Sequence, residues 1–121
     1  MSYTRFKATL KFNPVGEGLF FNLDVYTEKG RIFSTVYDCG STWPKHSLEK
    51  AIKNYTHGRR LIDLLTLSHL HQDHVNGTVQ LMQKLKVGTV MLPYISPNER
   101  LKIHYITERD GHTLSIKRRF M

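Results

Sequence analysis

Residues 64–77 read LLTLSHLHQDHVNG, and they concentrate more chemistry than any other part of the chain. The run Leu64–Leu67 is short and lacks alternation, which predicts a strand buried on both faces of a parallel sheet. Three histidines and one aspartate follow within six positions: His69, His71, Asp73 and His74. Imidazole nitrogens and carboxylate oxygens are ligands for zinc, iron or manganese. Since ligand sites of open α/β sheets lie where strands end, the stretch predicts a metal site at a sheet edge.

The N-terminal part of the chain alternates between apolar and polar residues, the pattern of half-buried strands. We expect strands at 5–12, 19–26 and 31–37, joined by turns at 13–18 and 27–30. Connections this short require antiparallel pairing. The apolar side chains expected to face the core are Phe6, Ala8, Leu10 and Phe12 in the first strand and Leu19, Phe21, Leu23 and Val25 in the second.

Residues 45–92 predict helix–strand–helix–strand, the arrangement of an α/β layer. One helix has an apolar face at spacings of three and four and ends near Gly58. A second helix follows the histidines, capped by Thr78, and a short buried strand covers 89–92. The helical faces consist of Leu48, Ala51, Ile52 and Tyr55 in the first helix and Val79, Leu81, Met82 and Leu85 in the second.

Length and composition predict a single domain over the 121 residues, with antiparallel strands in 1–42, an α/β part in 43–93 and a poorly specified basic tail in 94–121. A helix starting near Asn98 is a weaker expectation. No apolar run is long enough for a membrane helix and the N-terminus lacks a signal-peptide core, which together favour the cytoplasm. The single cysteine, Cys39, excludes an internal disulfide and a cysteine-based zinc cluster.

The formal charge is +8, and residues 100–121 contribute six basic against two acidic side chains. A basic balance favours anionic partners such as nucleic acid or a phosphorylated small molecule. A solvated basic surface explains the same charge equally well, and the sequence contains no DNA- or RNA-binding motif.

At the histidine stretch the sequence resembles the metallo-β-lactamase superfamily. The His-x-His-x-Asp-His motif of that family is matched in full at 69–74, and an acidic residue closing a strand is matched by Asp38. The turn at 14–18, PVGEG, is similar to the Val-Gly-x-Gly turn of the competence-type, DNA-uptake-related branch. The resemblance covers residues 5 to about 100.

The resemblance implies an αββα sandwich that holds one or two metals, usually zinc, and whose metal-bound hydroxide attacks an ester or phosphodiester. His69 and His71 would bind the first metal, while Asp73 and His74 would bind the second. Asp73 would also orient the hydroxide, which makes it the expected catalytic residue, and Asp38 would brace the histidine loop through hydrogen bonds. Iron and manganese share these ligand types and stay open as alternatives to zinc.

The resemblance also implies that the chain is the N-terminal half of the sandwich, apparently truncated. In the family a third histidine, a bridging aspartate and a final histidine come from a second half. His112, in Asp110-Gly111-His112-Thr113, is the only candidate here for the third histidine. A half-sandwich leaves one sheet face uncovered, which favours a homo-oligomer or another partner.

Three functional readings follow from the sequence. The first is a metal-dependent hydrolase that is incomplete as an isolated chain. The second is a non-catalytic metal-binding or interaction module derived from the same fold. The third is a basic anion-binding protein whose histidines no longer bind a metal.

Overall fold

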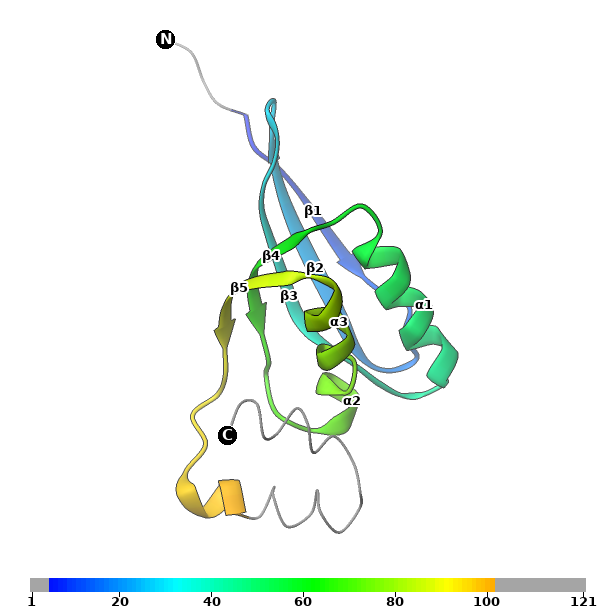
Figure 1. Cartoon of the computed structure of the whole chain (residues 1–121), viewed down its shortest axis with the longest axis vertical. Helices are drawn as coiled ribbons and strands as arrows, with labels where there is room; N and C mark the ends of the chain where they lie inside the picture. The colour runs from blue at the N-terminus through cyan, green and yellow to red at the C-terminus, as the bar shows by residue number, and fades with distance from the viewer. Residues whose placement is uncertain (1–4, 102–121) are drawn as a thin grey trace.

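The computed structural model of this protein describes residues 5–101, and these residues form a five-stranded mixed sheet with three helices between its strands and the beginning of a further helix at Pro97 (Figure 1). The strands follow chain order across the sheet, β1-β2-β3-β4-β5. The expected α/β class, with antiparallel strands followed by helix–strand–helix–strand, is confirmed. The elements are β1 Lys7–Phe12, β2 Glu17–Thr27, β3 Gly30–Trp43, α1 Lys45–Thr56, β4 Leu61–Thr66, α2 Gln72–Val75, α3 Thr78–Lys84 and β5 Lys86–Met91.

The sheet divides into an antiparallel and a parallel part. β1, β2 and β3 pair antiparallel, and the β2–β3 hairpin closes at Thr27 and Gly30, where Gly30 has a φ of 107°. β4 then pairs parallel with β3, and β5 pairs parallel with β4. β3 is longer than expected, because β2 begins at Glu17 and pairs with it as far as Trp43.

The core lies between the sheet and the helices, and α1 and α3 cover the same face of the sheet (Figure 1). The predicted apolar stripe of α1 is buried in full, and α3 buries Leu81 next to Leu85. Thr78 does not cap α3, contrary to prediction. Gly77 occupies the cap position, and the buried hydroxyl of Thr78 has no hydrogen-bond partner within residues 5–101.

The face of β1 and β2 that packs against the helices was predicted wrongly. The buried residues of β2 are Phe20, Asn22 and Asp24, and every residue of β1 is exposed. The polar side chains tolerate burial because Asn22 accepts a hydrogen bond from Asn13 and Asp24 pairs with Arg59. The apolar side chains of these two strands therefore point to the opposite face.

That opposite face is apolar, and we call it the uncovered sheet face. Residues paired directly across neighbouring strands point to the same side of a sheet. Two rows of such pairs cross all five strands and contain no charged residue. One row is Phe12, Phe21, Tyr37, Thr66 and Met91, and the other is Leu10, Leu23, Thr35, Leu64 and Thr89. Phe12 is 74% exposed and Met91 54% exposed, so no helix within residues 5–101 covers this face.

The two parallel strands are less buried than predicted. Leu65 and Leu67 are buried, but Leu64 is only half-buried because it belongs to the uncovered sheet face. The strand expected at 89–92 is found as β5 and is an edge strand, mostly exposed.

In the described part of the chain no helix has the length and apolar character needed to cross a membrane. The helix expected near Asn98 begins at Pro97, and its course beyond Leu101, like His112, lies outside the described residues.

Candidate metal centre

The four residues predicted to bind metal meet at the C-terminal end of β4. His69 and His71 lie in the segment that follows this strand, and Asp73 and His74 lie in α2. The four-residue α2 was not predicted, because the ligand-bearing residues carry no apolar periodicity that would indicate a helix. A backbone hydrogen bond from His74 N–H to the carbonyl of His71 closes the turn between the two pairs.

The ligand-bearing side chains lie within reach of a common ion. The rings of His69 and His71 have centroids 4.6 Å apart, and those of His69 and His74 are 3.9 Å apart. Asp73 Oδ2 lies 3.3 Å from His74 Nε2. Two groups have all their ligand atoms within 4.8 Å of one another: His69 with His71 and Asp73, and His69 with Asp38 and His74. His69 thus belongs to both groups, so the structure gathers the four residues more closely than the two separate pairs that the resemblance implies.

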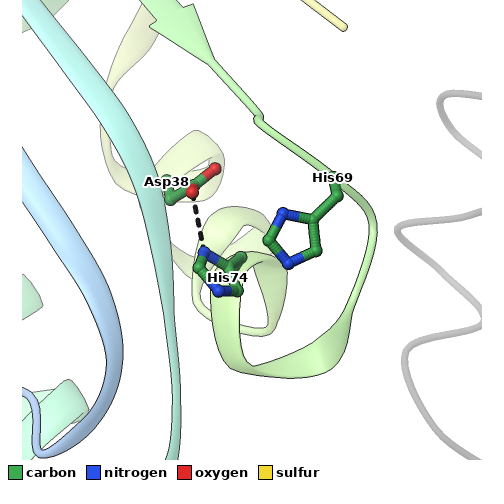
Figure 2. A group of neighbouring side chains, drawn as sticks. All are labelled: Asp38, His69 and His74. Atoms are coloured by element: carbon green, nitrogen blue, oxygen red, sulfur yellow. Dashed lines mark hydrogen bonds and ion pairs between the residues drawn. The ribbon is translucent and has the colours of Figure 1, made fainter. Parts of the chain in front are cut away.

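The buried carboxylate of Asp38 connects the histidine segment to α2 through hydrogen bonds to Ser68 and His74. Asp38 lies in β3, is fully buried and has a φ of 59°, a backbone conformation that only glycine, asparagine and aspartate adopt readily. Its Oδ1 accepts a hydrogen bond from Ser68 N–H at 2.8 Å. Its Oδ2 lies 2.8 Å from Nδ1 of His74 (Figure 2). The same oxygen accepts a hydrogen bond from the Ser68 hydroxyl at 2.5 Å. The carboxylate therefore holds both α2 and the start of the histidine segment.

Ser68 is a site residue that sequence reasoning missed. Its hydroxyl donates to Asp38 Oδ2 and lies 2.9 Å from His69 Nδ1. Since the hydroxyl proton is directed at the carboxylate, the oxygen is left to accept from Nδ1–H of His69. Its position directly before His69, at the end of a buried strand, was the available signal.

The same reasoning fixes the tautomers of two histidines. Asp38 accepts from Nδ1–H of His74, and Ser68 accepts from Nδ1–H of His69. In both rings these hydrogen bonds place the proton on Nδ1, so Nε2 is the ring nitrogen that a metal could use; in His74 it lies 3.3 Å from Asp73 Oδ2. Figure 2 shows the rings of His69 and His74 side by side, with Nδ1 of His74 directed at Asp38. Orientation by a hydrogen bond to the other ring nitrogen is the usual arrangement of metal-binding histidines.

The segment after α2 is fastened to β3. Asn76 exchanges two hydrogen bonds with the backbone of Ser41, at 2.8 and 2.6 Å, and Gly77 N–H donates to the Cys39 carbonyl at 2.8 Å. Gly40 allows the closest approach, since a Cβ there would lie 2.6 Å from the backbone of His74 and Val75. These contacts hold α2 against β3, the strand that carries Asp38, and so fix the positions of Asp73 and His74 relative to Asp38.

The donor set fits a divalent metal. Ligand atoms about 2 Å from one ion lie at most about 4 Å apart, so small side-chain rotations bring His69, His71 and Asp73 into that range. Burial, together with the neighbouring His74 and His71, lowers the pKa of His69 below its usual value. A lowered pKa favours the neutral imidazole, which is the form that binds metals.

A cavity of about 320 Å³ opens beside the cluster. Its lining includes Ser68, His69 and His71, and also Tyr94 and Glu99. Its volume is at the lower end of the roughly 300–1,000 Å³ of small-molecule sites. As far as residues 5–101 are concerned, the cluster is therefore open to a ligand.

Comparison with known proteins adds no relative. Neither a scan against protein-family models nor a search of curated proteins found a match for this chain.

Proposed function

We propose that residues 69–74 bind a divalent metal, with zinc as the first candidate, and that the chain is a metal-dependent hydrolase of the metallo-β-lactamase type. The observation that supports this most is that hydrogen bonds at Nδ1 orient the rings of His69 and His74, so that Nε2 of each ring is the nitrogen that a metal could use. Histidines that serve only packing or solubility do not require hydrogen bonds at Nδ1 of both rings. They also do not require a fully buried aspartate such as Asp38 beside them.

Each side chain has a role in the proposed chemistry. His69, His71 and Asp73 would hold one ion, and His74 would extend the set towards a second. A bound divalent metal supplies Lewis acidity and an activated water. Asp73 is the acid–base candidate, because its side chain is 41% exposed and its Oδ2 lies 3.3 Å from His74 Nε2.

The substrate class follows from the cavity and the charge. The cavity beside His69 and His71 admits an ester or phosphodiester group of a small molecule or a strand end. The net charge of +8 favours an anionic substrate, hence a phosphodiester. Within residues 5–101 all four candidate ligands come from the six-residue stretch 69–74, and the family resemblance assigns further ligands to a second half. We therefore expect a low rate from the isolated chain.

A hydrolysis assay tests this function. With zinc present, the chain should cleave bis(p-nitrophenyl) phosphate, and His71→Ala and Asp73→Asn should each lower the rate by about 100-fold, the effect of losing a ligand or an acid–base group. His57→Ala is the matched control, since His57 is exposed and lies outside the cluster. Equal rates for the wild type and His71→Ala would remove the enzymatic claim.

A second candidate is a metal-binding interaction module, and the uncovered sheet face favours it. Apolar patches of this kind mark interaction surfaces. We propose that the occupant is a second copy of the chain. Both rows of paired residues lack charge, so two chains of charge +8 can meet there without like charges in contact. A packed pair would place sheet against sheet.

Light scattering after gel filtration measures this association. The wild type should have twice the 14.1 kDa mass of one chain, and Phe12→Lys should shift it to the monomer. Phe12 is 74% exposed, so the change should leave the folded chain intact. Ile32→Lys, at an exposed apolar residue outside the two rows, is the control and should remain dimeric. A wild-type mass equal to that of one chain would contradict the proposed dimer.

A further inference from the structure

The cavity beside His69 is formed by two segments that leave the sheet at the same edge. β4 and β5 are parallel neighbours, and their pairing ends at Thr66 and Met91. A backbone hydrogen bond of 2.9 Å from Leu67 N–H to the Met91 carbonyl continues the contact by one residue. The chain after β4 brings the histidines to this edge, and the chain after β5 brings residues 93–95. The second segment therefore lies next to the candidate metal centre.

The segment after β5 gives this cavity an apolar wall. Eight described residues line the cavity, and four of them are apolar or aromatic: Leu70, Pro93, Tyr94 and Ile95. No lysine or arginine is among these eight residues, and Glu99 is the one acid. Ser96 donates from its backbone N–H and from its hydroxyl to Glu99 Oε2, each at 3.1 Å, so this carboxylate is engaged within its own segment. Beside the histidines the cavity therefore favours an apolar group of a substrate over a second anionic group.

Tyr94 is the tyrosine of this lining, and its neighbours hold it in place while its ring stays accessible. Tyr94 is 87% exposed. The next residue, Ile95, packs against the core, and Ser96 and Glu99 form a capping box in which Glu99 N–H donates back to Ser96 Oγ at 3.3 Å. A single exposed aromatic residue is ordinary on a protein surface. This one shares a cavity with two candidate metal ligands, which places its ring where a bound substrate would lie.

We propose that Tyr94 binds a flat ring that the substrate carries next to its phosphodiester, as an aryl ester or a nucleoside does. This inference rests on the proposed hydrolase function and adds the substrate class. A flat ring can stack on an exposed tyrosine whatever its hydrogen-bonding groups are, so the shared requirement is the aromatic face. Tyr94 contacts a part of the substrate that does not react. It therefore contributes to binding and to KM, and it leaves kcat unchanged.

NMR titration of the full chain in the presence of zinc tests this inference without turnover. The wild type should bind phenyl phosphate or thymidine monophosphate about tenfold more tightly than methyl phosphate, and the larger preference identifies the ring as aryl or nucleobase. Tyr94→Ala should remove the preference, and Tyr94→Phe should keep it because the ring is retained. Phe6→Ala is the matched control, since Phe6 is an aromatic residue that is 67% exposed and does not line the cavity. Its preference should equal that of the wild type.

Failure of this inference can be told apart from failure of the proposed function. A wild type that does not hydrolyse bis(p-nitrophenyl) phosphate removes the function, while the binding preference still decides the role of Tyr94. Where hydrolysis occurs, Tyr94→Ala should raise KM about tenfold and keep kcat within about twofold. The inference is overturned if Tyr94→Ala keeps the wild-type preference, or if none of the phosphates binds up to about 10 mM. Butyl phosphate that binds as tightly as phenyl phosphate overturns it as well, because any apolar group would then suffice.

Discussion

Replacing Asp38 by alanine is expected to lower the free energy of unfolding by about 3–5 kcal/mol and to weaken zinc binding by about 10–100-fold. The carboxylate accepts hydrogen bonds from Ser68 N–H, the Ser68 hydroxyl and His74 Nδ1–H. Its removal leaves these donors unpaired in a partly buried network. It also places alanine at a φ of 59°, which costs about 1–2 kcal/mol.

Two further variants separate these causes. Asp38→Asn tolerates the same backbone conformation, so it should lose less stability than the alanine variant while still disturbing the histidines. Asp63→Ala removes a carboxylate that accepts two hydrogen bonds from Ser34, at 2.7 and 3.3 Å, away from the histidines. It should lower stability without changing zinc affinity. Urea unfolding in chelator and zinc competition titrations measure the two quantities separately.

The account of Asp38 would be wrong if the alanine variant unfolded within about 1 kcal/mol of the wild type, the net worth of one ordinary hydrogen bond. It would be equally wrong if Asp63→Ala lowered the zinc affinity as much as Asp38→Ala.

The sequence predicted which residues share a face more reliably than which face is covered. The stripe of α1 was correct because a helix with one apolar side has only one side to bury. In β2 the alternation is equally clear, but the buried set contains Asn22 and Asp24. Their burial depends on partners elsewhere in the chain, such as Arg59, 35 residues after Asp24. No local sequence pattern predicts such a pairing. The apolar side chains of β1 and β2 were therefore predicted to face the core.

The sequence predicted which candidate ligands lie together, but it did not predict most of the residues that hold them in place. His69, His71, Asp73 and His74 stand together in the sequence, and the end of β4 brings them together in space. Asp38 was expected from the family resemblance, and its three hydrogen bonds agree with the bracing role. Ser68 and Asn76 were missed, because serine and asparagine in a loop have many uses and only the fold shows their partners.

Replacing His71 by alanine should lower zinc affinity by about 100-fold or more while leaving stability in chelator within about 0.5 kcal/mol. His71 is exposed, and it contributes a ligand atom within reach of His69 and Asp73. Zinc should therefore raise the melting temperature of the wild type and not that of the variant, because only a ligand of the folded state stabilises it. His46→Ala, at an exposed histidine outside the cluster, should respond to zinc as the wild type does. Equal zinc-induced shifts in His71→Ala and the wild type would exclude His71 as a ligand.

Metal content after equilibrium dialysis and gel filtration tests the proposed metal centre most directly. Measured by inductively coupled plasma mass spectrometry, the wild type should retain at least one zinc, iron or manganese ion per chain. The double variant His69→Ala/His71→Ala should retain none, because each of the two groups of ligand atoms contains His69. A wild type without stoichiometric metal, or a double variant with the same content as the wild type, would contradict the account.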